Sequence, residues 1–300
     1  MAKILIGTSS WADRGLVESE FYPETVKTPA DRLRFYSGIF SVAEIDSSYH
    51  HFPMNRELDY WLGNTPDNFV YDIKAFSMFT QHPTPLASLP RSLREEFGDE
   101  IKATGNLYWH HLPEKAAQEL WAGFDRSVKI IQDAGKLGAV TFQFPPWFHP
   151  ANGGFDYLSH VREMLPDLPL AVEFRFDNWL NDEHRDNTLR FLKQKNIALV
   201  CVDEPQGFRS SIPPVAAVTS SLAIVRFHGR NVDAWEVKAM GPENKFKYLY
   251  QKNELEEWLP KVREISKEAE EIHIIFKNKY ADYPERNARQ FARMLEIPGF

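Results

Sequence analysis

Charged side chains stand at the ends of short β-type runs, and their types suit proton transfer and anion binding. Glu173 and Arg175 lie two residues apart in one run, and Arg226 and His228 do so in another. Side chains alternate across a strand, so the members of each pair share a face. Arginine offers a planar fork for carboxylate or phosphate, and histidine exchanges a proton near neutral pH. The pattern predicts acid/base chemistry on an anionic substrate, with hydrolysis or isomerisation as the expected reaction types.

Three strand-end residues are candidates for the chemical step. We expect His228 to be the general acid/base and Glu173 to be a basic or charge-stabilising carboxylate, with Glu44 as the alternative carboxylate. An arginine beside Glu173 would hold that carboxylate ionised. Gly229 follows His228 and would let a backbone N–H approach a phosphate oxygen, although this glycine is equally suited to turning the chain.

Other polar or aromatic residues near run ends are expected to contact substrate. They are Arg175, Arg226, Lys74, Asp46, Gln143, Asp203, Asn278 and Trp179. The acids expected to face inward are Glu44, Asp46, Asp72, Glu173 and Asp203, and the cations are Lys74, Arg175 and Arg226. This set leaves about two uncompensated negative charges, and burying unpaired charge costs several kcal/mol per ion. The charges therefore indicate either a hydrated pocket for a ligand or a structural ion-pair network that closes the end of the fold.

The elements that must position these residues follow a regular alternation. The β-type runs are 4–8, 42–46, 69–74, 139–144, 170–175, 198–203, 222–228 and 271–278. Helical patterns lie between most of them, at 29–38, 55–63, 114–134, 155–164, 182–195, 252–269 and 284–295. The alternation predicts a closed eight-stranded parallel β/α barrel of the TIM type, whose active site lies at the C-terminal ends of the strands. We expect residues 1–300 to form one domain, with long loops after strands 1, 3 and 6 and an insertion or lid at 75–113.

Composition restricts the partners. The formal net charge of −7 disfavours nucleic acid and anionic membranes as partners, and a small anionic molecule is the expected substrate. No apolar run approaches the roughly 20 residues needed to span a bilayer. The single cysteine, Cys201, cannot form an internal disulfide, and the first strand follows the N-terminus without an apolar signal. We expect a cytoplasmic protein, and its oligomeric state stays open.

Two alternative functions stay open. Barrel sugar isomerases and barrel apurinic endonucleases gather Glu, Asp and His around divalent ions, and the acidic excess here would tolerate one. A divalent-metal phosphodiesterase or endonuclease is therefore the first alternative, and a non-catalytic metabolite-binding protein is the second. Only His228 is a strand-end histidine expected to face inward, and three inward cations would repel a metal. We therefore assign no metal ligand and no cofactor.

Several stretches, taken in order, resemble a known family. They are IGTSSW with FYPE at 6–24, VAEIDSSYHHFP at 42–53, PDNFVYDIKA at 66–75, FQFPP at 142–146, LAVEFRFDNW at 170–179, VRFHGR at 225–230, KYLYQKNELEEW at 247–258 and RNARQFARML at 286–295. Together they resemble the Domain of Unknown Function 72 family, also called the YecE-like family. The chain departs from the family pattern at Ser10, Gln81 and Lys277. The resemblance implies a β/α barrel and leaves the activity open.

Overall fold

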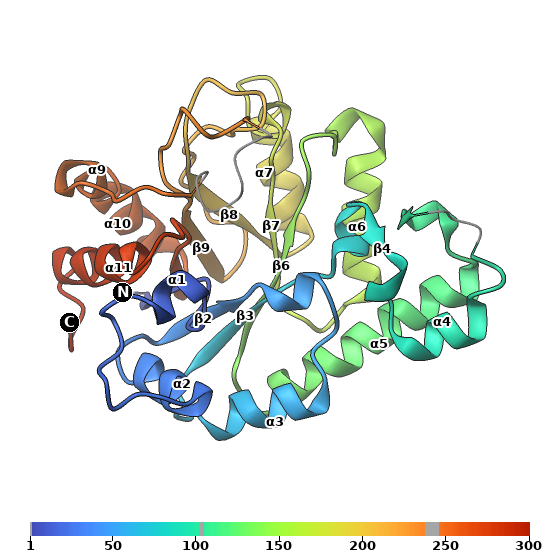
Figure 1. Cartoon of the computed structure of the whole chain (residues 1–300). Coiled ribbons are helices and arrows are strands. Elements are labelled where there is room, and N and C mark those ends of the chain that lie inside the picture. The colour runs from blue at the N-terminus through green and yellow to red at the C-terminus, as the bar shows by residue number, and fades with distance from the viewer. Residues whose placement is uncertain (1, 102–104, 238–245) are drawn as a thin grey trace.

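Eight parallel strands close into a barrel in the computed structural model, which describes residues 2–101, 105–237 and 246–300 (Figure 1). The strands are β1 (Lys3–Thr8), β2 (Val42–Ile45), β3 (Val70–Lys74), β6 (Leu137–Gln143), β7 (Leu170–Glu173), β8 (Ile197–Asp203), β9 (Leu222–Phe227) and β10 (Glu271–Phe276). β1 pairs with β10 and brings Ile6 opposite Ile274, so the predicted closure is confirmed. Strands covered on both faces need apolar residues on both, and every residue of β8 is buried.

Helices surround the barrel (Figure 1). They are α1 (Arg14–Val17), α2 (Pro29–Ser37), α3 (Asn55–Gly63), α4 (Arg91–Phe97), α5 (Glu114–Asp133), α6 (Phe155–Met164), α7 (Arg185–Gln194), α9 (Lys252–Glu256), α10 (Leu259–Glu268) and α11 (Tyr283–Met294). The helix expected over 252–269 is divided, because Pro260 occupies the first turn of a new helix, where its missing N–H costs nothing. Among the described residues, no helix combines the length and apolarity required to cross a membrane.

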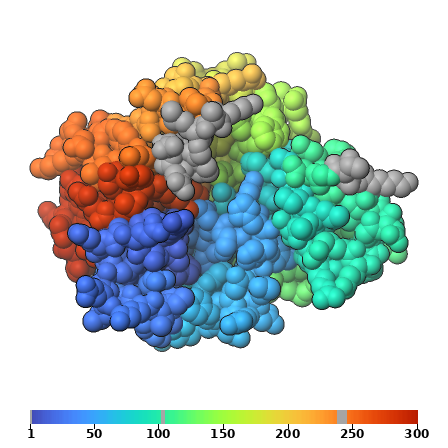
Figure 2. All heavy atoms as spheres, in the orientation of Figure 1, coloured from blue at the N-terminus to red at the C-terminus, as the bar shows by residue number. Residues whose placement is uncertain are grey.

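The excursion after β3 packs beside the barrel. Its short strands β4 (Thr84–Pro85) and β5 (Asn106–Leu107) pair antiparallel, and α4 lies against α5. Phe79 stacks on Trp121 of α5 with ring centroids 3.8 Å apart. In Figure 2 the turquoise atoms of this excursion project from the right side of the molecule. Within the segment expected as an insertion or lid, α4 and Phe79 thus pack against α5.

A buried ionic cluster lies inside the barrel, below the strand ends. His273 Nδ1 is 2.9 Å from Asp72 Oδ1, and His273 Nε2 is 2.7 Å from Glu271 Oε1. Asp72 therefore pairs with histidine across the barrel and does not belong with Lys74 at the mouth. Gly138 of β6 faces this cluster: an added Cβ would lie 2.4 Å from Asp72 Oδ1 and 2.5 Å from His273 Cε1. The glycine leaves the space that the ion pair occupies.

Gly138→Ala should therefore destabilise the protein by about 1–3 kcal/mol, because the methyl group would displace a buried ion pair. Urea denaturation would measure the loss. Gly63→Ala, at the end of α3, is the matched control, since nothing lies within 4 Å of its added Cβ. Equal stability of the two variants would contradict the close packing around Gly138.

Candidate functional site

Arg226 is the centre of a buried ion-pair network at the C-terminal end of the barrel. Its guanidinium contacts the carboxylates of Glu44 and Glu173, and all three side chains are fully buried. Glu173 also accepts a hydrogen bond of 2.7 Å from Gln143 Nε2, its neighbour in register on β6. Arg175 Nε lies 2.7 Å from Glu173 Oε1. Five of the residues expected at the site are thus brought together.

His228 belongs to the same buried layer. Its Nε2 lies 3.1 Å from Glu173 Oε1 and 2.9 Å from Arg175 Nη2. Burial, and then the charge of Arg175, hold the pKa of His228 well below its usual value, so the imidazole is neutral at pH 7. Burial alone would raise the pKa of Glu173, but Arg175 and His228 lower it below its ordinary range. This layer keeps a carboxylate ionised and a histidine neutral.

The arginine forks were expected to bind a ligand anion, but they contact protein groups. Arg226 contacts Glu44 and Glu173, and Arg175 pairs with Glu173 and Glu204. The Arg175 guanidinium also lies over the Trp235 ring, 5.2 Å from its centroid. Neither arginine lines the described part of a cavity of about 890 Å³ that lies beyond this layer. The two arginines organise the layer beneath the cavity.

Three lysines converge on Asp46 beyond this layer. Lys277 Nζ and Lys279 Nζ donate to its carboxylate at 2.8 and 2.6 Å, and Lys74 Nζ lies 3.8 Å away. Burial would raise the pKa of Asp46, but the three ammonium groups lower it well below its usual range. Lys277 also donates to Glu44 at 3.0 Å and so links the lysines to the buried layer.

The lysine cluster, which we define as Lys74, Lys277 and Lys279, lines a cavity of about 890 Å³. The cavity extends from the strand ends to the loop after β1 and the start of α11. There Glu285 accepts a hydrogen bond of 3.1 Å from Thr8 Oγ1, and burial raises the pKa of Glu285 to about 8. The described part of the wall otherwise carries the cations Arg14, Lys74, Lys277 and Lys279 and the carboxylates Asp13, Glu18 and Asp46. With Glu285 protonated at pH 7, the cavity has a cationic excess.

The sequence did not identify Lys277 and Lys279 as site residues. Ile275 pairs in register with Arg226, so residues 275 and 277 share the inward face of β10 and its extension. Asn278 was expected to face inward and in fact faces outward. Its side-chain amide donates to Tyr248 O at 2.7 Å and to Asn287 Oδ1 at 2.9 Å. Asn278 therefore anchors α11.

Asp203 was also expected to face inward, and it faces outward. It pairs in register with Phe227, which packs outward on α11. Asp203 accepts hydrogen bonds of 2.7 Å from Tyr250 Oη and 2.6 Å from Trp258 Nε1. A bidentate contact from Arg230 adds to these bonds. These contacts hold the helices after β9 against the barrel.

Trp179 does not reach the cavity either. Its ring is fully buried and stacks on Phe174 and Phe148 with centroid separations of 4.2 and 5.3 Å. The indole Nε1–H donates to Phe148 O at 2.7 Å. Its apolar area and its donor are both used in packing between β7 and α6. The expectation of substrate stacking on this side chain is not met by its position.

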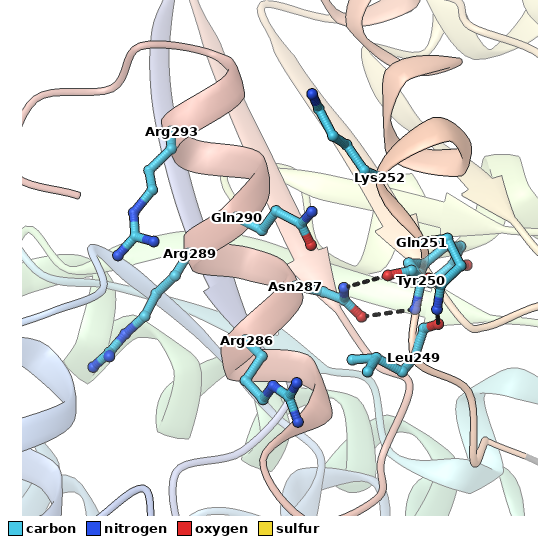
Figure 3. A pocket seen from close by; sticks show the side chains of 9 residues that line it. All are labelled: Leu249, Tyr250, Gln251, Lys252, Arg286, Asn287, Arg289, Gln290 and Arg293. Atoms are coloured by element: carbon cyan, nitrogen blue, oxygen red, sulfur yellow. Dashed lines mark hydrogen bonds between the residues drawn. The ribbon is translucent and has the colours of Figure 1, made fainter.

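A second cavity of about 480 Å³ lies between α11 and the segment before α9. Figure 3 shows Arg289 and Arg293 extending away from the segment that carries Lys252. Asn287 joins the two sides through hydrogen bonds of 3.0 Å with Tyr250 N and O. The cations diverge, so this groove lacks a focused anion site. Among the described residues, no cluster of three or more His, Cys, Asp and Glu side chains has an arrangement that could hold a metal ion.

Comparisons with known proteins cover almost the whole chain. The family model described as "Protein of unknown function DUF72" matches residues 5–299. UPF0759 protein YunF of Bacillus subtilis (strain 168) is 30% identical, over 98% of this chain and 95% of that protein. A crystal structure of a DUF72 family protein from Enterococcus faecalis V583 is similar with a TM-score of 0.78 and 25% identity, over 99% of this chain and 97% of that chain. A DUF72 family structure from Thermotoga maritima MSB8 has a TM-score of 0.74 and 29% identity, over 98% and 99% of the two chains. The protein described here therefore belongs to the DUF72 family.

Proposed function

We propose that this protein is an enzyme that uses acid/base chemistry on a small polar substrate bearing a phosphate or carboxylate group. The observation that carries the proposal is the lysine cluster on the wall of the cavity. Three lysine side chains share Asp46 at the C-terminal ends of the strands, where barrel enzymes place their active sites. The volume of about 890 Å³ is in the range of small-molecule sites, about 300–1,000 Å³. A ligand anion would relieve the crowding of positive charge.

Proton transfer is best assigned to Lys74. Burial, and then the charge of Lys277, lower the pKa of Lys74 to about 7, and an acid or base works best with a pKa near the working pH. His228, expected in this role, is buried and has a strongly lowered pKa. In this proposal Glu173 and His228 are positioning residues, which act through Arg226 and Glu44 on Lys277. Hydrolysis and isomerisation stay the proposed reaction classes.

Lys277→Met is expected to weaken binding of an anionic probe, such as glycerol 3-phosphate, by about tenfold to a hundredfold. Charge-assisted hydrogen bonds of this kind are worth about 1.5–3 kcal/mol. Isothermal titration calorimetry would measure both proteins, with glycerol as the neutral probe. Lys267→Met is the matched control, because Lys267 is exposed and pairs only with Glu264 among the described residues. Equal affinity of Lys277→Met and Lys267→Met for glycerol 3-phosphate would contradict the proposed anion site. Binding of glycerol as tight as that of glycerol 3-phosphate would contradict it as well.

A further inference from the structure

Lys74 differs from its two neighbours in the lysine cluster. Lys277 and Lys279 each donate hydrogen bonds to carboxylates at 2.6–3.0 Å. The Lys74 ammonium lies 3.8 Å from Asp46 and makes no hydrogen bond to any residue that the structure describes. Its side chain is 13% exposed and lines the cavity. Lys74 therefore has the least constrained amine of the three and faces the space where a substrate would lie.

The surroundings favour the neutral form of this amine. Burial, then the charge of Lys277, lower its pKa to about 7. At pH 7 a much larger fraction of Lys74 side chains therefore carries a free lone pair than of amines with the ordinary value of 10.5. Desolvation and a neighbouring cation are the two devices by which enzymes activate lysine as a nucleophile.

Lys74 is placed on the cavity wall by its strand and lies next to an aromatic ring. It ends β3, so its backbone belongs to the barrel wall, which holds a reacting group more firmly than a loop does. The ring of Tyr49 lies beside the amine, with Nζ 4.6 Å from the ring centroid. Tyr49 also lines the cavity, as does Gln143. The amine thus lies beside an aromatic ring at the end of a barrel strand, on the wall of the cavity.

We propose that Lys74 forms an imine with an aldehyde or ketone substrate whose anionic group is held by Lys277 and Lys279. This inference rests on the proposed function and specifies its substrate class as carbonyl compounds that carry an anion. It makes Lys74 a covalent nucleophile as well as a proton carrier. The imine nitrogen, once protonated, withdraws electrons from the adjacent carbon, which suits isomerisation and carbon–carbon bond cleavage.

The covalent step is balanced within the site. The lone pair of Nζ attacks the carbonyl carbon, and the carbonyl electron pair moves to oxygen, which gains a proton. The nitrogen loses a proton to give a neutral carbinolamine. A second proton on the hydroxyl lets it leave as water, and the C=N bond forms. The Lys277 ammonium, which shares Asp46 with Lys74, is the proposed donor of both protons, and between the two steps its neutral amine takes up the proton that the attacking nitrogen releases. The products are one protonated imine, one water and one neutral Lys277 amine, with no oxidant or reductant required.

Borohydride trapping with glyceraldehyde 3-phosphate tests the imine directly, since the reduced adduct survives digestion and peptide mapping by mass spectrometry. At pH 7 the adduct on Lys74 should exceed that on exposed Lys267 of the same sample by at least about tenfold, given the larger neutral fraction of Lys74. Lys74→Arg keeps the charge and should lose this adduct while remaining folded. Equal labelling of Lys74 and Lys267, or an adduct confined to Lys277, would overturn the proposal.

Two comparisons separate this inference from the proposed function. If glycerol 3-phosphate binds but Lys74 is not labelled, the anion site stands and the imine fails. If glyceraldehyde and its phosphate label Lys74 equally, the imine stands and the anion site fails. Preferential labelling of Lys74 by the phosphate, with loss of that preference in Lys277→Met, supports both.

Discussion

Replacing Arg226 by methionine is expected to lower the free energy of unfolding by about 3–5 kcal/mol. The guanidinium is the contact between Glu44 and Glu173, and none of the three side chains is exposed. Methionine would fill part of the volume and leave both carboxylates in a medium that solvates them poorly. Lys277 and Arg175 would still face them, but neither can replace a fork shared by two acids. Urea denaturation would measure the loss.

Two further variants separate charge from volume. Arg185→Met removes an arginine whose ion pairs with Asp182 and Asp186 are exposed, so the expected change is below about 1 kcal/mol. Glu44→Gln combined with Arg226→Met removes one of the two carboxylates that the Arg226→Met variant leaves without an arginine, and should regain part of the stability. If the double variant is no more stable than Arg226→Met, the loss comes from packing and not from unpaired charge.

The second large effect is a pH dependence that arises from His273. Burial would lower its pKa, but Asp72, followed by Glu271, raises it to about 9 from an ordinary value of 6.5. The folded state therefore binds the proton more tightly, so the contribution of His273 to stability is complete below about pH 6.5 and is lost as the pH rises through 9. The raised value corresponds to about 3 kcal/mol, because each pKa unit is worth about 1.4 kcal/mol.

The measurement must be a difference between proteins. Lys74 and Lys277 have lowered pKa values in the folded state, so their contribution grows more favourable as the pH rises above 7 and opposes that of His273. The stability advantage of the protein over His273→Gln should fall by about 3 kcal/mol between pH 6 and pH 10. A constant difference in stability across this range would show that folding does not raise the pKa of His273.

The barrel could be predicted from the sequence because the strands are short apolar runs and helical periodicity follows most of them. The sequence predicted less well which side of the sheet a residue at a strand end would face. β8 is buried along its whole length, so its composition does not reveal which alternate residues face the axis, and Asp203 was assigned to the wrong side. The same ambiguity led us to expect Asn278, and not Lys277, on the inward face. Which residues of a strand face inward is defined only by pairing with a neighbouring strand, as Ile275 pairs with Arg226.

The partners in each ion pair could not be predicted from the sequence either, because they meet across the barrel. Glu44 is on β2 and Arg226 is on β9, and these strands are not neighbours in the sheet. Asp72 and His273 are 201 positions apart in the chain and meet inside the barrel. Residue types could show that the charges needed partners, whereas only the closed ring decides which ones they receive. The lysine cluster depends on the same closure.

The seam between β1 and β10 has a consequence for biosynthesis. β1 is made early and pairs on one side with β2, but its other edge waits for a strand 268 positions later. Until that strand leaves the ribosome, the nascent sheet is open and its unpaired edge can recruit another chain. Lys277 directly follows this last strand, so Glu44 lacks its lysine partner until residue 277 has been synthesised. Closure of the ring and assembly of the cationic cavity are therefore one late event in the life of the chain.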